Sequence, residues 1–196
     1  SISSILRIGD TTNGLVFEPN GSNVGVTMTG NARRIKSINL QPEYAGAVMT
    51  SDGASSVGSM TSDNESALPF RNYYQWTTSQ TASQEYEIWV RVPLPEDFSA
   101  FVSNTIKTTA YRSASTNASV LMSIRDSNGA LSDVASVSVA TSNAAWTSTT
   151  LTSGVPTGTY ASGSSFIFQI ETIADNSPTS PAARISSISF DYYSKF

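Results

Sequence analysis

Apolar and polar side chains alternate along much of this chain, and this alternation restricts its fold more than any other feature. The clearest case is residues 85–92, where the even positions are all apolar and Glu85, Glu87, Trp89 and Arg91 occupy the odd ones. Successive side chains of a strand point to opposite faces, so such a segment predicts a strand with one buried face. Helical spacing is almost absent from the sequence.

Further segments follow the same rule and are bounded by Gly, Asn, Asp, Ser and Pro. They lie near residues 34–40, 44–49, 70–76, 105–111, 120–124, 134–139, 145–151, 166–170 and 184–193. Residues 126–129 (DSNG) predict a hairpin turn, and residues 95–98 (PEDF) predict the first turn of one short helix. About eight strands at spacings of roughly 8–12 residues predict an antiparallel β-sandwich of jelly-roll type over residues 33–196. We expect Trp76 and Trp146 in its core.

Residues 1–32 have a different pattern, in which short apolar triplets alternate with Gly- and Asn-rich turns. We expect an extended β segment that is too thin to form a core alone. It must bury its apolar residues on the sandwich or on another subunit, for example by adding a strand to a neighbour's sheet edge. The second route predicts a homo-oligomer, either a trimer or a strand-exchanged polymer. The self-association candidates are Ile2, Leu6, Ile8, Leu15 and Phe17.

Composition excludes several kinds of chemistry. The 196 residues include no His and no Cys, which rules out a Ser-His-Asp triad, a thiol nucleophile and a zinc site of the usual type. The net charge is −4, and the only basic cluster, residues 33–36, fits a solvated strand edge, so nucleic acid is not expected as a partner. No apolar run is long enough for membrane insertion. Ser and Thr make up more than a quarter of the chain, which suits the solvent faces of strands.

Outward-facing aromatic residues are the main ligand candidates. Trp89 lies on the polar face of its strand beside Arg91, and such a residue can stack on a sugar, anchor an interface or pack under a loop. Tyr73 and Tyr111 also lie opposite the apolar face of their strands, so we include them with Trp89 and Arg91 as ligand or interface candidates.

Carboxylates supply two weaker signals. Glu85 and Glu87 leave one strand face about 6.5–7 Å apart, near the roughly 6.5–9.5 Å used by inverting glycosidases, although any polar strand face with two acids gives this spacing. Acid and amide clusters occur in predicted turns, at residues 10–13, 52, 63–65 and 126–128. Turn chemistry explains them. We therefore expect no cofactor and no metal site, with a structural calcium as the remaining alternative.

Six stretches together resemble a known module. They are residues 6–17 (LRIGDTTNGLVF), 32–36 (ARRIK), 40–48 (LQPEYAGAV), 58–63 (GSMTSD), 72–78 (NYYQWTT) and 86–95 (YEIWVRVPLP). Their order resembles a module at the C-terminal ends of large, fibre-like surface proteins of uncultivated ultrasmall bacteria of the candidate phyla. The Gly- and Asn-rich start is also similar to the shaft-to-head junction of phage tail fibres. The resemblance implies an extracellular, adhesive or appendage-forming protein, on a cell surface or a virion fibre, and implies no reaction.

These observations lead to three functional hypotheses. The first is a non-enzymatic extracellular module of a surface fibre or filament that self-associates through its N-terminal strand and its sandwich. The alternative is a carbohydrate-binding module that stacks cell-surface glycans on Trp89 together with Tyr73 or Tyr111. A glycoside hydrolase that uses Glu85 and Glu87 is a distant third.

Overall fold

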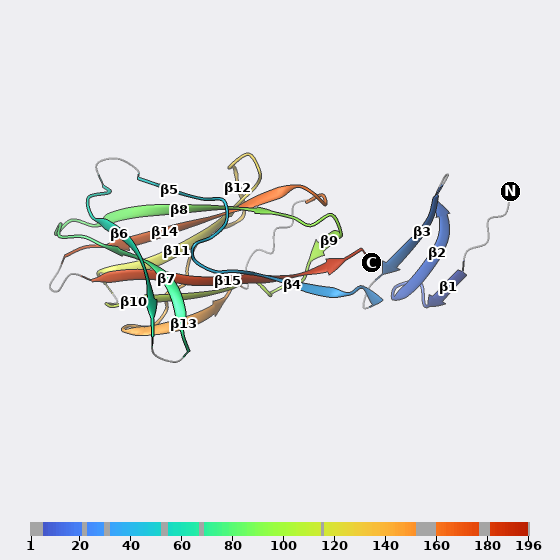
Figure 1. Ribbon diagram of the computed structural model, residues 1–196, viewed down its shortest axis with the longest axis horizontal. Helices are drawn as coiled ribbons and strands as arrows, with labels where there is room; N and C mark the ends of the chain where they lie inside the picture. Colours follow the sequence, from blue (N-terminus) through green and yellow to red (C-terminus); the bar gives the residue numbers. More distant parts are fainter. Residues whose placement is uncertain are drawn as a thin grey trace.

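The computed structural model describes residues 6–20, 23–29, 32–51, 55–66, 69–114, 116–151, 160–176 and 181–195. These residues contain fifteen strands and no α-helix (Figure 1). The N-terminal strands are β1 (Leu6–Gly9), β2 (Gly14–Asn20), β3 (Asn23–Thr29), β4 (Ile35–Leu40) and β5 (Ala47–Thr50). The middle strands are β6 (Ser59–Glu65), β7 (Arg71–Thr77), β8 (Gln84–Pro93), β9 (Phe98–Phe101) and β10 (Lys107–Arg112). The C-terminal strands are β11 (Ala118–Arg125), β12 (Leu131–Ser138), β13 (Ala145–Thr150), β14 (Ser165–Ala174) and β15 (Ala182–Ser194).

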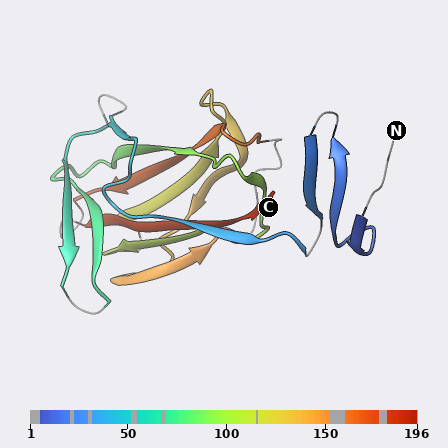
Figure 2. The ribbon, with the colours of Figure 1, turned by 45° about the vertical axis from the view of Figure 1, so that its right-hand side comes forward.

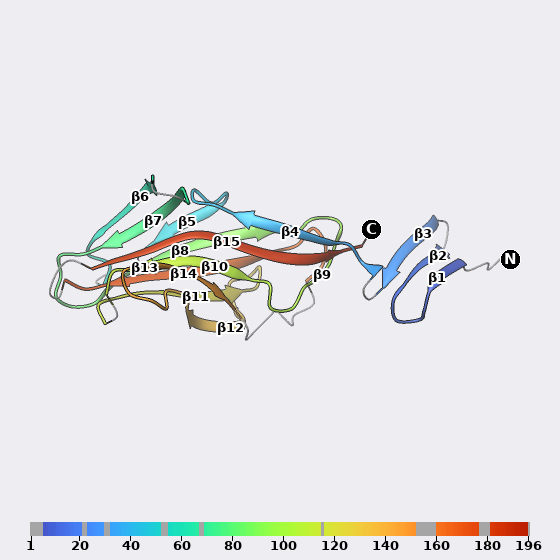
Figure 3. The same cartoon turned by 90° about the horizontal axis from the view of Figure 1, so that it is seen from below.

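Two antiparallel sheets pack face to face, which confirms the predicted β-sandwich of jelly-roll type. The five-stranded sheet has the order β12-β11-β14-β8-β5. The seven-stranded sheet has the order β13-β10-β15-β7-β6, and its long strand β15 also pairs with β4 and β9. In Figure 1, β8 and β14 of the five-stranded sheet lie above β15, β10 and β13 of the seven-stranded sheet, and in Figure 3, seen from below, the two sheets overlap. We call these two layers the five-stranded and the seven-stranded sheet below.

The centre of the five-stranded sheet is the pair β8 and β14. Their register is unbroken over ten residues, from Ser165 opposite Pro93 to Ala174 opposite Gln84. Ile88 on β8 and Phe168 on β14 are fully buried between the sheets, as is Phe190 on β15 across the core. Aromatic rings fill the middle of this core, and Phe166 contacts Phe168 and Phe190 edge-on.

Two elements differ from the sequence prediction. The acid and amide cluster at residues 63–65, assigned to turn chemistry, lies in strand β6, which pairs with β7 along its whole length. The segment at 95–98 is a tight turn rather than a helix start, because the Phe98 N–H bonds the Pro95 carbonyl at 2.9 Å and the chain then enters β9. Strand β6 is stabilised by pairing with the next strand, β7, and β9 by pairing with the distant strand β15, so tertiary context overrides local propensity at both sites.

Strands β1, β2 and β3 form a separate three-stranded antiparallel sheet. The three views place this sheet beyond the end of the sandwich, near the C-terminal end of β15 (Figures 1 and 2). Strand β1 pairs with β2 of the same chain, so residues 6–9 already have a partner on one side. The predicted boundary near residue 32 falls between this sheet and β4.

Candidate functional site

Strand β8 presents Glu87, Trp89 and Arg91 on the outer face of the five-stranded sheet. The residues between them, Ile88 and Val90, are fully buried, so the alternation predicted for this strand is confirmed. Trp89 is half-buried and Arg91 is exposed. The outer face of this sheet therefore carries an aromatic ring with charged neighbours.

A closed set of contacts holds the Trp89 ring. Its Nε1 donates to Oε2 of Glu87, and Oε1 of Glu87 accepts from Nε2 of Gln169 at 2.7 Å. Nε of Arg125 donates to Oε1 of Gln169 at 2.6 Å, and its guanidinium lies 5.0 Å from the centroid of the Trp89 ring. We call these four residues the Trp89 network. A guanidinium covers one face of an indole through a cation–π contact, so the network holds the ring at one face and at its Nε1 edge.

The network is assembled by strand register. Gln169 on β14 lies directly opposite Trp89, and Glu171 lies directly opposite Glu87. Arg125 is the last residue of β11, which pairs with the other side of β14. Three strands that are adjacent only in the folded sheet thus place these side chains on one face.

The predicted hairpin turn at residues 126–129 packs over the network. Oδ1 of Asp126 accepts backbone hydrogen bonds from Asn128 at 2.8 Å and Ala130 at 2.9 Å. Gly129 has a φ of 85°, and its carbonyl accepts from Nη1 of Arg125 at 2.8 Å. A Cβ at this glycine would lie only 3.8 Å from the Trp89 ring. The turn therefore lies against the indole and limits its motion.

A pocket of about 320 Å³ opens beside Trp89. Its lining residues are Gly46, Val48, Thr50, Trp89, Arg91 and Ile167. Val48 on the edge strand β5 lies directly opposite Trp89 and is 61% exposed although it is apolar. Pockets of this size, with apolar walls and a few polar groups, are typical of small-ligand sites.

Two carboxylates lie at the other end of this face. Burial raises the pKa of Glu171, and repulsion from Glu87 adds to the rise, while Arg125 opposes it. No hydrogen bond or ion pair joins the Glu171 carboxylate to another residue that the structure describes. Glu85 and Glu87 share a face as predicted, but both oxygens of Glu87 already accept hydrogen bonds within the Trp89 network.

Tyr73 and Tyr111 lie on the outer face of the seven-stranded sheet, on the opposite side of the sandwich from Trp89. The Arg184 guanidinium lies 4.8 Å from the Tyr73 ring centroid and 4.7 Å from that of Tyr111. Tyr73 is only 7% exposed. The structure therefore does not bring either tyrosine to Trp89, and Arg184 covers a face of each ring.

Trp146 completes this second cluster. Its ring centroid lies 5.6 Å from that of Tyr73 and 5.5 Å from that of Tyr111, and Arg71 lies 4.8 Å from it. The prediction that Trp146 belongs to the core is wrong, because it is a half-buried residue of edge strand β13 on the outer face. The same prediction is confirmed for Trp76, which is 1% exposed.

Four of the five self-association candidates, Leu6, Ile8, Leu15 and Phe17, share one face of the three-stranded sheet. Leu6 lies opposite Phe17, and Ile8 lies opposite Leu15. Leu6 and Ile8 are each 59% exposed. Ile2 falls outside the described residues. This face is apolar in sequence and open in the structure.

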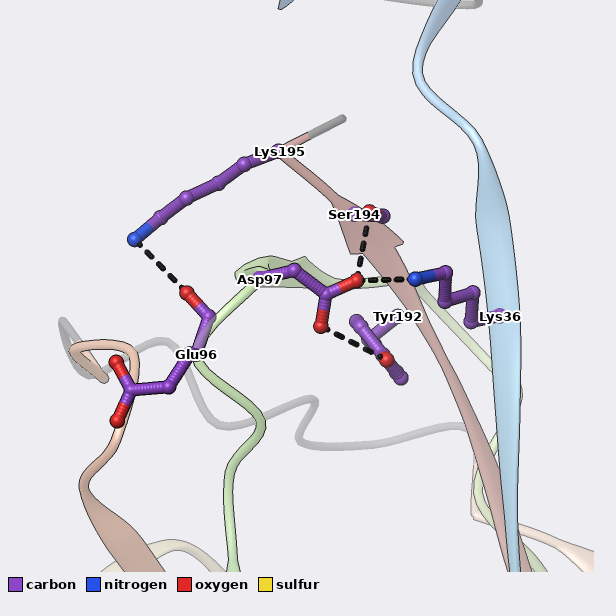
Figure 4. Close-up of polar contacts among 6 residues, drawn as sticks. All are labelled: Lys36, Glu96, Asp97, Tyr192, Ser194 and Lys195. Atoms are coloured by element: carbon purple, nitrogen blue, oxygen red, sulfur yellow. Dashed lines mark hydrogen bonds and ion pairs between the residues drawn. The ribbon is translucent and has the colours of Figure 1, made fainter.

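Asp97 is the centre of a polar network at the end of the sandwich that faces the three-stranded sheet (Figure 4). It forms an ion pair with Lys36 on β4 and accepts hydrogen bonds from Ser194 at 2.8 Å and Tyr192 at 3.2 Å, both on β15. The hydrogen bonds from Lys36 and Ser194 lower the pKa of Asp97. The network joins β4 and the turn before β9 to the end of the last strand.

The acid clusters in turns carry local hydrogen bonds. Oδ1 of Asp10 accepts from the backbone N–H groups of Thr12 at 2.7 Å and Asn13 at 2.6 Å, which lower the pKa of Asp10. Within the described ranges, no group of three or more acidic side chains gathers in a way that could hold a metal ion. Nor does any helix in the part of the chain that the structure describes have the length and apolarity to cross a membrane.

Sequence reasoning missed Gln169, Arg125, Glu171 and Val48. Gln169 interrupts the apolar run 166–170 at an odd position, and this parity is the signal that could have placed it on the outer face. Nothing in the sequence pairs β14 with β8, which lies about 80 residues earlier. The cross-strand partners of Trp89 therefore needed the structure.

No known protein family and no curated protein matches this sequence. Solved structures that resemble the chain include a carbohydrate-binding module, TmCBM61 in complex with β-1,4-galactotriose, at 8% identity and a TM-score of 0.45, covering 75% of this chain and 88% of that one. The family 11 carbohydrate-binding module of a cellulosomal cellulase of Clostridium thermocellum is 13% identical, with a TM-score of 0.44 and coverage of 82% and 95%. The enzymatically active domain of tailspike protein 4 of bacteriophage CBA120 is 15% identical, with a TM-score of 0.46, and the match covers 74% of this chain and 19% of the tailspike. Carbohydrate-binding modules and a phage tailspike domain are thus among the remote structural likenesses of this chain.

Proposed function

We propose that this chain is a non-enzymatic glycan-binding module, and that the outer face of the five-stranded sheet is its binding surface. The observation that carries the proposal is the arrangement of Trp89. One face of its ring is held by Arg125, and the ring lines an open pocket next to the exposed, apolar Val48. A fixed aromatic plane beside an apolar wall suits the apolar face of a sugar ring.

The polar groups around this ring match the hydroxyl groups of a sugar. The Thr50 hydroxyl and the Arg91 guanidinium line the same pocket. The hydroxyl donates to the Ser51 carbonyl at 3.3 Å and offers an acceptor, whereas the guanidinium offers donors. The Glu171 carboxylate lies further along the face and offers acceptors. Because Trp89 is already held by the network, little ordering of the protein is needed when a ligand binds.

The test is a glycan array that includes neutral, uronic and sialylated glycans, followed by titration of each hit with variants. We expect Trp89→Ala to lower the affinity at least about tenfold and Trp89→Phe to retain part of it, because a phenyl ring still stacks. Phe70→Ala is the matched control, since Phe70 is an aromatic residue that is 61% exposed elsewhere on the sandwich. If no glycan binds, or if Trp89→Ala binds as wild type does, the proposal is rejected.

We expect binding without hydrolysis because of the contacts of Glu87. Its two oxygens accept hydrogen bonds from Trp89 and Gln169, which suits a structural acceptor. We expect no release of reducing ends from any bound glycan. Turnover that disappears in Glu85→Gln, Glu87→Gln or Glu171→Gln would instead identify a glycoside hydrolase.

Self-association is a second candidate, favoured by the open apolar face of the three-stranded sheet. A three-stranded sheet needs to cover such a face to be stable, and its apolar residues Leu6 and Ile8 are exposed. We propose that further copies of the same sheet cover it, giving a homo-oligomer suited to the end of an extracellular fibre. Light scattering after size exclusion should show an oligomer for the full chain and a monomer for Ile8→Glu. A monomeric wild type rejects this candidate and leaves glycan binding untouched.

A further inference from the structure

We propose that the sugar bound beside Trp89 carries a carboxylate, which Arg91 binds through the Nε–Nη2 edge of its guanidinium. The proposal rests on the glycan-binding function above and narrows its ligand to acidic glycans.

Arg91 is positioned by one of its three nitrogens. Nη1 donates to the Ser127 carbonyl at 3.1 Å and to Oγ of Ser165 at 3.0 Å. These acceptors come from the turn after β11 and from the first residue of β14, and they fix the plane of the guanidinium. Within the described residues, Nε and Nη2 have no hydrogen-bond partner, and the side chain is exposed. The Nε–Nη2 edge of the Arg91 guanidinium is thus oriented and free.

No carboxylate of the described chain neutralises this guanidinium. The ion pairs of Lys36 with Asp97 and of Arg71 with Glu65 lie elsewhere and do not involve Arg91. Asp126 lies next to Ser127, but its Oδ1 accepts two backbone N–H groups of its own turn. Every other arginine described near an aromatic ring on the sandwich faces lies over that ring, whereas Arg91 lines the pocket.

The acidic groups of the same face lie at its other end. Arg91 is opposite Ile167, while Glu87 is opposite Glu171, four residues away along both strands. At about 3.3 Å per residue this separation is roughly 13 Å. A ligand with a carboxylate at one end only would satisfy Arg91 without approaching Glu171.

A carboxylate fits the free edge better than other groups do. The two parallel N–H bonds of the Nε–Nη2 edge match the two oxygens of a planar carboxylate. Trp89, Val48 and Ile167 provide the apolar walls that a sugar ring requires at the same place. The two features together indicate a sugar acid, either a hexuronic acid or a nonulosonic acid such as sialic acid.

Two matched pairs of oligosaccharides test the proposal by calorimetry on the full chain. One pair is a xylotriose that carries a single glucuronic acid and its carboxyl-reduced form, and the other is 3′-sialyllactose and lactose. In at least one pair we expect the acidic member to bind about 10-fold to 100-fold more tightly, the range for hydrogen bonds to a charged group. The pair that shows the preference identifies the class of sugar acid.

Variants assign the preference to Arg91. Arg91→Gln should remove it, Arg91→Lys should keep part of it because an ammonium is a point charge without a fork, and raising the salt concentration should reduce it. Lys107→Gln, which removes an exposed positive charge from the seven-stranded sheet, is the control and should leave it unchanged.

The outcomes separate the two proposals. Equal affinities within both pairs, or a preference that persists in Arg91→Gln, overturn the assignment of Arg91. If the array finds only neutral glycans, the acidic ligand is rejected and glycan binding stands. If the array finds no glycan at all, both proposals are rejected.

Discussion

Gln169 connects the two charged members of the Trp89 network, so replacing it tests whether that network prepares the site. Gln169→Leu keeps a similar volume on β14 but removes the donor to Glu87 and the acceptor for Arg125, at 2.7 and 2.6 Å. Gln169 is 4% exposed. The two partners retain some contact with water, so we expect the free energy of unfolding to fall by about 1–3 kcal/mol rather than by two full charged hydrogen bonds.

The effect on binding comes from the freedom of the Trp89 ring. Without Gln169, Glu87 keeps only its hydrogen bond from Trp89 and Arg125 keeps only its hydrogen bond to the Gly129 carbonyl. The indole is then held less firmly and must be ordered further when the ligand binds. Ordering one large side chain costs about 0.5–1.5 kcal/mol, which corresponds to a roughly two-fold to tenfold loss of affinity. Urea unfolding measures the first effect, and calorimetry with the best array ligand measures the second.

The seven-stranded sheet offers a matched control. Gln75 accepts a hydrogen bond from Nε of Arg184 at 2.6 Å, the same contact that Gln169 makes with Arg125. Gln75→Leu should therefore lower the stability and leave glycan affinity unchanged. Wild-type affinity in Gln169→Leu, or an equal loss of affinity in Gln75→Leu, would refute the reasoning that the network prepares Trp89.

Three predictions concern stability. Burial raises the pKa of Tyr44 well above its ordinary value, so Tyr44 ionises first in the unfolded chain. Its contribution to stability is therefore complete below about pH 10 and is lost as the pH rises. Tyr44→Phe should reduce the alkaline slope of the unfolding free energy by up to about 1.4 kcal/mol per pH unit, and the Ser186 carbonyl left without its hydrogen bond should cost about 1–3 kcal/mol. The lowered pKa of Asp97 makes stability depend on pH in the opposite direction. The contribution of Asp97 is present above its pKa in the unfolded chain and is lost as the pH falls through its lower pKa in the folded protein. In urea unfolding between pH 2 and 6, the stability of Asp97→Asn should therefore change less with pH than that of the wild type. Phe168→Ala removes a fully buried ring from the core and should cost about 3–5 kcal/mol, and a loss below 1 kcal/mol would contradict its central position.

The part of the fold that could be predicted from sequence is the part set by local alternation. The strand at 85–92 and the hairpin at 126–129 were both identified because period-2 patterns and turn residues act within a few positions. Strand β6 was missed because its sequence, with Asp63 and Asn64, has low strand propensity and is stabilised by pairing with β7. Trp146 was misplaced because alternation gives two faces but does not say which is buried on an edge strand.

The candidate site could be predicted only as single residues. Trp89 and Arg91 were chosen because they alternate with the apolar residues of their strand, and both line the pocket. Tyr73 and Tyr111 were chosen by the same argument, yet they lie on the other sheet, because parity does not show which strands share a layer. The partners that give Trp89 its orientation depend on the long-range register of β8 and β14.

The two outer faces of the sandwich show why one aromatic cluster is suited to binding and the other is not. On the seven-stranded sheet, Arg184 covers faces of Tyr73 and Tyr111, and Trp146 packs against both, so the rings mainly contact one another and their arginines. On the five-stranded sheet, Arg125, Glu87 and the turn at residues 126–129 lie against Trp89. The ring also borders a pocket whose arginine has an oriented, unpaired edge. Similar residue types thus produce a self-contained cluster on one face and, on the other, an aromatic ring beside an open pocket and a cation with an unpaired edge.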